Sequence, residues 1–252
     1  MPPLLNRKTG SDRGGRRNWP AADTNDMQGQ KKGLVIAIDG PSGAGKSTVA
    51  RLLAQRLGYT YIDTGAMYRA IGWKAKQEGI DPADELGLDS LCARTVVTIK
   101  VDHDDPRIVV DAVDVTGEIR TPEMGMMASA VSKSPAVRAR LLGLQRELGS
   151  HGGVVMDGRD IGTVVFPKAD LKFFLDARPE ERGQRRYREL RQNGMDVDLD
   201  RITREIRERD RQDSGRELAP LKAAADAHVI DSSTMSIDEV LAVMMELAGK
   251  RM

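Results

Sequence analysis

The segment that constrains this chain most is a glycine-rich run at residues 40–47, GPSGAGKS. It matches the pattern G-x-x-x-x-G-K-[ST] of phosphate-binding loops at every position. Its glycines allow backbone N–H groups to point inward at phosphate oxygens, and the N-terminus of the following helix adds partial positive charge. Lys46, expected to be exposed, would reach the β- and γ-phosphates, and the Ser47 hydroxyl would bind Mg²⁺. The motif predicts nucleotide binding but leaves the reaction open.

The sequence around this motif predicts an α/β fold. Residues 34–39 form a continuous apolar run, which is typical of a strand buried on both faces of a parallel sheet. Helix, strand and helix patterns then alternate, so the chain is expected to adopt the P-loop NTPase fold with a central parallel sheet. The predicted helices cover residues 47–57, 64–78, 179–192, 200–212 and 236–248. The further predicted strands cover residues 59–63, 153–157, 171–176 and 228–231.

The middle of the chain departs from this alternation. Residues 95–101 and 107–111 are rich in β-branched side chains and are separated by a turn-like segment, which predicts an antiparallel hairpin. Two helices are expected after it, over residues 122–132 and 135–148. We interpret residues 95–145 as an insertion in the P-loop core, which otherwise runs from residue 33 to residue 252.

Composition gives weaker constraints. The net charge is +1, so no overall field draws the protein to nucleic acid or to a membrane. No apolar run approaches the roughly 20 residues that span a bilayer, and the N-terminus lacks the apolar stretch of a secretory signal. A soluble, cytoplasmic protein that binds small-molecule nucleotides is therefore expected, and a monomer is the default. Cys92 is expected to be a buried apolar residue rather than a nucleophile.

Residues 1–32 are predicted to form a disordered basic tail. They hold seven Lys/Arg and three Asp, a balance of 7 − 3 = +4, and have almost no apolar periodicity. One interpretation is a basic arm for nucleic acid or targeting. The interpretation that we favour is a solvated extension, or a start codon assigned upstream of a true start at Met27.

Two polar clusters follow predicted strands at their carboxyl ends, where ligands bind in such sheets. Thr64 and Arg69 follow the second strand and could meet a phosphate beside the glycine-rich loop. Taken alone, these two residues are explained better by a helix cap and a solvated arginine. Asp157 ends the strand at residues 153–157 and could serve the magnesium shell. Arg159 and Asp160 would then face the phosphoryl acceptor.

The helix over residues 200–212 carries charge on its inward face. Its apolar stripe includes Ile202 and Ile206, and helical spacing extends the stripe to Arg209, Asp213 and Arg216. Inward charge is costly unless it is paired or bound to a ligand. A structural ion pair accounts for Arg209 and Asp213 about as well as a ligand does, but the third in-line charge favours a site.

Six stretches carry a more specific pattern: IDGPSGAGKST, DTGAMYRA, TGEIRTPE, MDGRDIGTVVFP, FFLDARPEERGQRRYREL and RERDRQDSGRELAPL. In them the sequence resembles the bacterial cytidylate kinases, from about Leu34 to the C-terminus. The resemblance implies phosphoryl transfer from ATP to CMP or dCMP with Mg²⁺. Another small acceptor, such as UMP or shikimate, is the alternative. A nucleotide-switch protein is more distant, because it would need an N-K-x-D segment that the sequence lacks.

The resemblance also implies a role for each matching residue. ATP would be bound by the loop residues Gly40, Pro41, Ser42, Gly43, Ala44, Gly45, Lys46, Ser47 and Thr48. The acceptor would be bound by Thr64, Arg69, Ser129, Arg138, Arg159, Asp160, Arg209, Asp213 and Arg216. Within this set, Thr64, Arg69 and Arg159 would hold the phosphate. Ser129, Arg138 and Asp160 would read the cytosine edge, and Arg209 and Asp213 would hold the pentose, with Arg216 near base or phosphate.

The resemblance places catalysis and metal binding in the same region. The magnesium ligands would be Ser47 and Asp157. Residues 178–200 would form a short lid, some of whose arginines embrace the transferring phosphoryl group. The catalytic residues would be Lys46, Arg159, Arg182, Arg185 and Arg186.

Overall fold

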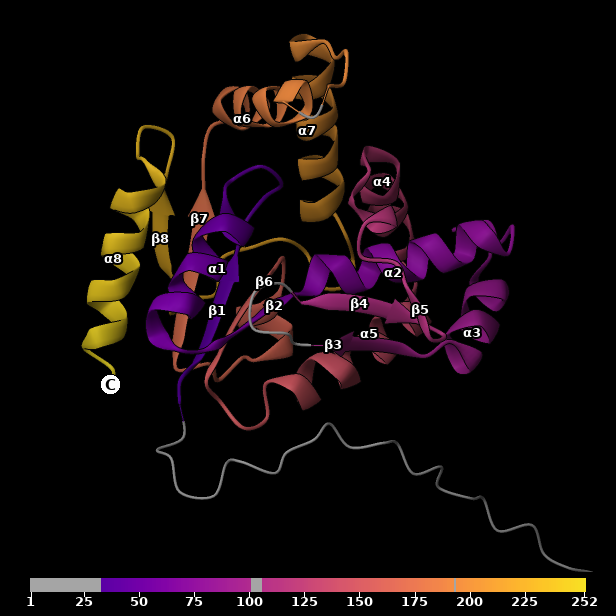
Figure 1. Ribbon diagram of the computed structural model, residues 1–252, viewed down its shortest axis with the longest axis horizontal. Coiled ribbons are helices and arrows are strands. Elements are labelled where there is room, and N and C mark those ends of the chain that lie inside the picture. The colour runs from indigo at the N-terminus through magenta and orange to yellow at the C-terminus, as the bar shows by residue number, and fades with distance from the viewer. Residues whose placement is uncertain (1–32, 101–105, 193) are drawn as a thin grey trace, which may run out of the picture. The chain divides into compact units, whose positions relative to one another are not determined.

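The computed structural model describes residues 33–100, 106–192 and 194–252. Within these ranges, the centre is a parallel sheet of five strands in the order β2-β6-β1-β7-β8 (Figure 1). The strands are β1 (Val35–Asp39), β2 (Thr60–Asp63), β6 (Val154–Gly158), β7 (Leu171–Asp176) and β8 (His228–Asp231). The predicted fold class, a P-loop fold with a central parallel sheet, is confirmed.

Apolar side chains fill both faces of this sheet, as the uninterrupted apolar run of β1 predicted. Ile36 and Ile38 belong to a buried cluster that they share with helices α1 and α8. Ala37, between them, faces the other way into a cluster shared with helices α2 and α5. These helices are α1 (Lys46–Leu57), α2 (Thr64–Gln77), α5 (Pro135–Leu148) and α8 (Ile237–Gly249).

A second, antiparallel sheet lies in the segment that we interpreted as an insertion. Its strands are β3 (Val97–Lys100), β4 (Arg107–Val110) and β5 (Val113–Asp114), and helix α4 (Pro122–Val131) follows a 3₁₀ turn, η1 (Glu118–Arg120). The predicted hairpin of β3 and β4 is confirmed, while β5 was not expected. Helix α4 can pack closely against α2 because Gly72 has no side chain. A Cβ placed at Gly72 would lie only 2.9 Å from the Cβ of Met127.

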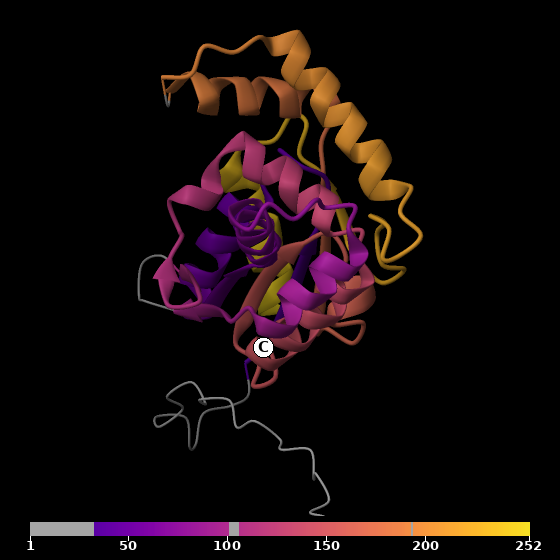
Figure 2. The same ribbon diagram turned by 90° about the vertical axis from the view of Figure 1, so that its right-hand side faces the viewer.

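Helices α6 (Pro179–Gln192) and α7 (Leu199–Ser214) pack on each other beyond the carboxyl edge of the sheet (Figures 1 and 2). Leu190, Ile202 and Ile206 form their small buried cluster. The helices can approach closely since Gly183 has no Cβ; one placed there would lie 2.4 Å from the Thr203 hydroxyl. Besides this small cluster, two ion pairs join the helices, Arg182 with Asp210 and Arg207 with Glu180.

Two helical segments were not predicted. Helix α3 (Glu85–Arg94) has Leu88, Leu91 and Cys92 on its buried side. Their spacing of three and four residues is typical of one face of a helix. Residues Ile161–Val165 form one π-helical turn, η2, directly after β6. The predicted tail at residues 1–32 lies outside the described residues. None of the helices in the described ranges is both long and apolar enough to cross a membrane.

Candidate active site

The glycine-rich loop connects β1 to α1 and has the backbone conformation that its glycines predicted. Gly40, Gly43 and Gly45 have φ angles of 146°, 78° and 93°, which side chains disfavour. At Gly40 there is also no room, because a Cβ would lie 2.0 Å from the carbonyl oxygen of Leu175. Gly45 precedes the first turn of α1 without a side-chain cap, so the N–H groups of that turn are left for a ligand.

Lys46 lies inside this loop, and the expectation that it is exposed was wrong. Its side chain is buried and its Nζ donates a hydrogen bond to the carbonyl oxygen of Pro41 at 2.6 Å. The loop wraps around the ammonium group, which accounts for the burial. Burial, followed by the charge of Arg159, lowers the pKa of Lys46, although Asp157 opposes this shift.

Asp157 lies at the carboxyl end of β6 and faces the same loop. The Ser47 hydroxyl donates to its Oδ2 at 2.8 Å, and the Tyr61 hydroxyl donates to its Oδ1 at 3.0 Å. The carboxylate is buried, and burial, with the nearby charge of Asp63, raises its pKa to about 6. A cation would favour the ionised form of this group, so the pair of oxygen donors on Ser47 and Asp157 fits a magnesium ion.

The rest of the described chain is consistent with that kind of metal site. The described residues contain no cluster of three or more His, Cys, Asp or Glu side chains that could hold a metal by itself. Mg²⁺ typically binds to one or two protein oxygens and takes its other ligands from water and substrate phosphates.

The end of β2 supplies the next group of polar side chains. Asp63 caps α2 by accepting the N–H of Ala66 at 2.9 Å, and it also pairs with Arg69 at 2.8 Å. Thr64 is buried, and its hydroxyl donates to the main-chain carbonyl of Asp157 at 2.8 Å. The helix cap that we considered exists, but Asp63 provides it, and Arg69 is oriented by this cap rather than free in solvent.

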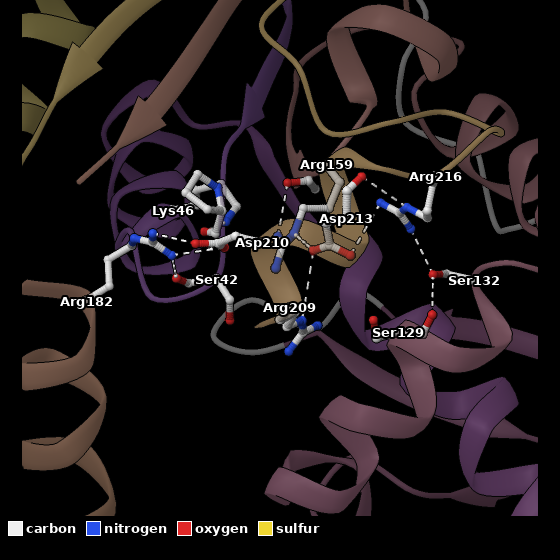
Figure 3. A network of polar contacts seen from close by, with 12 residues as sticks. Ser42, Lys46, Ser129, Ser132, Arg159, Arg182, Arg209, Asp210, Asp213 and Arg216 are labelled. Carbon is white, nitrogen blue, oxygen red and sulfur yellow. Dashed lines mark hydrogen bonds and ion pairs between the residues drawn. The ribbon is translucent and has the colours of Figure 1, made fainter. Parts of the chain in front are cut away.

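Asp213 of α7 is the centre of a cluster of three arginines, of which Arg209 lies on α7, Arg159 directly follows β6 and Arg216 follows the end of α7 (Figure 3). Its Oδ2 accepts a hydrogen bond from the Nε of Arg159 at 3.0 Å. Arg209 and Arg216 form ion pairs with the same carboxylate at 3.9 and 3.6 Å. Burial alone would raise the pKa of Asp213, but these three guanidinium groups outweigh it and hold the pKa below its usual value. The inward stripe that the sequence predicted is confirmed.

A second ion pair joins Asp160 to α5, because its carboxylate accepts a hydrogen bond from Arg138. Ser132 links this pair to the first cluster. Its hydroxyl accepts from Arg216 at 2.8 Å and donates to the carbonyl of Ser129 at 2.8 Å, and its own carbonyl accepts from Arg138 at 3.3 Å (Figure 3). The predicted residues Ser129, Arg138, Asp160 and Arg216 are therefore brought together on one wall.

The arginines of α6 contact the glycine-rich loop in different ways. Arg182 is buried and donates to the carbonyl of Ser42 at 3.0 Å, while its guanidinium forms a two-pronged pair with Asp210 at 2.6 and 3.1 Å (Figure 3). Arg185 donates to the carbonyl of Ala44 at 3.3 Å and to Ser232. Arg186 instead pairs with Glu189, one turn along α6, at 2.6 Å.

Several polar residues of the site were not predicted, among them Asp39, Ser132 and Asp210, and also Tyr61 and Asp63. Asp39 follows the apolar run of β1 and directly precedes the glycine-rich loop, so the carboxyl-end rule that we applied to Asp157 also pointed to it. Asp210 lies beside Arg209 in the sequence, but off the helical stripe. Ser132 gave no signal, because its role depends on the meeting of α4 and α7.

Three guanidinium nitrogens of the site are buried and, within the described ranges, have no hydrogen-bond partner: Nε of Arg69, Nε of Arg209 and Nη2 of Arg216. Arg209 also lies near enough to Arg159 and Arg69 for their charges to act on it. Buried donors are nearly always satisfied in folded proteins, by protein, water or ligand. The cluster of arginines beside the loop thus has excess positive charge and donors without a hydrogen-bond partner, which suits a phosphorylated ligand.

A phosphate-binding loop, an acidic group at the end of the neighbouring strand and a cluster of arginines beside them define a P-loop kinase. Comparison with known proteins narrows this class. Residues 36–250 match the family model for cytidylate kinase, and the chain belongs to this family.

The chain is similar to named cytidylate kinases along most of its length. It is 51% identical over 218 residues to that of Syntrophotalea carbinolica, with 86% of this chain and 93% of the relative covered. It is 53% identical over 219 residues to that of Pelotomaculum thermopropionicum, with 86% and 97% covered. For Geobacter sulfurreducens the identity is 50% over 221 residues, with 88% and 95% covered.

Proposed function

We propose that this chain transfers the γ-phosphoryl group of ATP to CMP or dCMP, giving ADP and CDP or dCDP. Family membership supports the reaction. The observation that carries the proposal is the set of buried guanidinium nitrogens on Arg69, Arg209 and Arg216 that have no hydrogen-bond partner within the described ranges, beside a complete phosphate-binding loop. Unsatisfied buried donors are costly, and a nucleoside monophosphate would supply phosphate, pentose and base oxygens as acceptors.

On the donor side, residues 40–48 would hold the ATP phosphates with backbone N–H groups. Lys46 would stabilise the negative charge of the transferring group, and its burial strengthens that interaction because water is excluded. Ser47 and Asp157 would hold Mg²⁺, which when bound neutralises charge on the phosphate oxygens. The chain needs no nucleophile of its own, since positioning and charge stabilisation account for this chemistry.

On the acceptor side, different residues would bind the phosphate, the pentose and the base of the substrate. Thr64, Arg69 and Arg159 would hold the phosphate, next to the loop. Asp213, buried and surrounded by arginines, would accept a pentose hydroxyl, with Arg209 beside it. Residues 95–145 would contribute Ser129 and Arg138 to the wall that reads the base.

Asp160 is the residue that we propose for the choice of cytosine. Its carboxylate can accept from the exocyclic amine of cytosine but repels the O4 of uracil. Arg138 and Ser129 would complete the contacts to the base edge, and Arg216 would support them. Recognition by buried polar groups discriminates strongly between bases, because a wrong base leaves those groups without hydrogen-bond partners.

Helix α6 would act as part of a lid over the transferring group. Arg182 and Arg185 hold carbonyl groups of the glycine-rich loop, so they would fix the lid's hinge end to the loop. Arg186 pairs with Glu189 on its own helix, and a partly exposed pair of this kind is weak. Arg186 is therefore the lid arginine that can change partner most readily, and we propose that it contacts the phosphoryl group on closure.

The test is an ADP-release assay over a panel of monophosphates and shikimate. We expect CMP and dCMP to be used best, AMP and GMP to be poorer by several orders of magnitude, and UMP to lie between. In Asp160→Asn, kcat/KM for CMP should fall and the gap to UMP should narrow, because an amide can present either polarity.

Asp226→Asn is the matched control for this substitution. Asp226 also pairs with a cation, Lys172 at 2.8 Å, but its own side chain is exposed, whereas that of Asp160 is buried. Asp226→Asn should leave the ratio of CMP to UMP unchanged. A panel in which another acceptor exceeds CMP would overturn the proposed function, whereas an unchanged ratio in Asp160→Asn would move base reading to Ser129 and Arg138.

A further inference from the structure

The turn that carries Arg159 and Asp160 has an unusual cap. Asp160 precedes η2, the position from which a side chain normally caps a helix, yet it makes no side-chain cap bond. Its carboxylate is used instead by Arg138. The N–H groups at the start of η2 are bonded by a residue from another strand: Asp39 accepts the N–H of Ile161 at 2.8 Å and that of Gly162 at 2.7 Å.

Asp39 lies where the two halves of the site meet. It is the last residue of β1, adjacent in the chain to the loop glycine Gly40, and its side chain is buried. In the sheet it is paired with Gly158, the residue before Arg159. One carboxylate therefore joins the strand that leads into the donor loop to the turn that presents the acceptor-side residues.

We propose that Asp39 is a positioning residue for the phosphoryl acceptor. By capping η2 from β1, it releases the Asp160 carboxylate to pair with Arg138 on the base wall and fixes the turn from which Arg159 projects. It contacts main-chain atoms of this turn, so its effect on substrate is transmitted through Arg159 and Asp160. This inference rests on the proposed function only in naming CMP as the acceptor.

The geometry requires a carboxylate rather than an amide. Each oxygen of Asp39 accepts one N–H, and an amide has a single oxygen, so Asp39→Asn would place an NH₂ group against a backbone N–H. The contact is also tightly packed, because a Cβ at Gly162 would lie 3.3 Å from Oδ2 of Asp39 and 3.1 Å from Cδ of Lys172. Gly162→Ala therefore disturbs the same bond from the opposite side.

The experiment measures KM for CMP and KM for ATP separately in Asp39→Asn. We expect KM for CMP to rise at least about tenfold, because small displacements of positioning groups have large effects. KM for ATP should stay within about twofold, since the loop itself is unchanged. Gly162→Ala should also raise KM for CMP more than KM for ATP, but by a smaller factor. This variant replaces Asp39→Asn in the experiment if Asp39→Asn does not fold.

Asp170→Asn is the control. Asp170 accepts the N–H of Val35 at 2.8 Å, a carboxylate-to-backbone bond at the opposite end of the same strand. A loss of general strand stability should lower Tm in both variants without separating the two KM values. Equal KM for CMP in folded Asp39→Asn and in the wild type, or a parallel rise in both KM values, would overturn the inference. If the panel identifies a different acceptor, the proposed function fails, and the same split is measured with that acceptor.

Discussion

Two buried carboxylates, one beside the donor loop and one on the acceptor side, differ in how their charge is compensated. Beside the loop, burial raises the pKa of Asp157 to about 6 and lowers that of Lys46. On the acceptor side, Asp213 is just as buried, but three arginines hold its pKa below the usual value. Burial shifts other charged groups of the acceptor side toward the neutral form, since it raises the pKa of Asp160 and lowers that of Arg209 to about 10. The contrast therefore lies between Asp157, whose charge a cation would favour, and Asp213, whose charge is already paired. Three substitutions test this difference.

The largest expected effect is that of Lys46→Ala on turnover. We expect kcat to fall at least about 10²-fold, the scale for removal of one preorganised charge from a reacting centre. Tm without nucleotide should not fall, because the substitution removes a buried charge that burial disfavours and leaves Arg159 with one fewer like-charged neighbour.

Two measurements separate these effects. The kcat of the coupled assay reports on the chemistry, and thermal unfolding with and without ATP reports on stability. The ATP-dependent rise in Tm should shrink in the variant. A marked loss of Tm in the absence of nucleotide would show that Lys46 is a structural contact of the loop, and the contrast with the acceptor pocket would then be wrong.

The second expected effect is that of Asp213→Asn on stability. Removal of this charge leaves the positive charges of Arg159, Arg209 and Arg216 without their common partner. A buried charge that loses its partner destabilises the folded state strongly. Because Arg159 and Arg209 are partly exposed, we expect about 2 kcal/mol rather than the full effect of a buried pair. KM for CMP should also rise, with little change in base choice.

Denaturant unfolding at pH 7 measures the loss. Asp210→Asn offers a comparison, since Asp210 lies on α7 like Asp213 but pairs with Arg182 of α6 instead of with the acceptor-side arginines. It should lower stability without raising KM for CMP. An Asp213→Asn protein as stable as the wild type would mean that the arginines do not depend on this carboxylate.

The same contrast explains how much of the molecule could be predicted. The donor loop is contiguous, and its conformation follows from its own glycines, so the motif alone located it. The parallel sheet followed because its apolar runs are bounded by clear helix and turn signals. The pocket is assembled from side chains far apart in the chain, such as Arg216 and Ser132, which are separated by 84 residues. Local patterns placed Arg209, Asp213 and Arg216 on one face, but their partners depended on tertiary packing.

The residues that the sequence missed have the same cause. Helical spacing identified charges aligned with the apolar stripe of α7, and Asp210 lies to one side of that stripe. It became relevant only because α6 places Arg182 against it. The exposure of Lys46 was also misjudged, since the burial of a loop lysine depends on how closely the loop closes around it.

The smallest expected effect, and the most direct test of the contrast, is that of Asp157→Asn. This is the same chemical change as Asp213→Asn, with the opposite expected sign. Asp157 has a pKa raised from 3.8 to about 6, so its ionisation disfavours the folded state progressively as pH rises from about 4 to about 6. A shift of this size corresponds to about 3 kcal/mol, but asparagine offers only one oxygen to the hydroxyl groups of Ser47 and Tyr61. The asparagine variant should therefore be more stable than the wild type at pH 7 in EDTA by about 1 kcal/mol, and this difference should diminish as pH falls toward 4. Asp213→Asn should show the reverse, a loss of stability at pH 7 that diminishes under acid conditions, because the lowered pKa of Asp213 makes its ionised form stabilising.

Mg²⁺ with ATP should raise Tm of the wild type more than that of Asp157→Asn. If Asp157→Asn is instead destabilised at pH 7 as strongly as Asp213→Asn, then other groups of the protein already compensate the charge of the Asp157 carboxylate. The ionised carboxylate would then be stable without a bound cation.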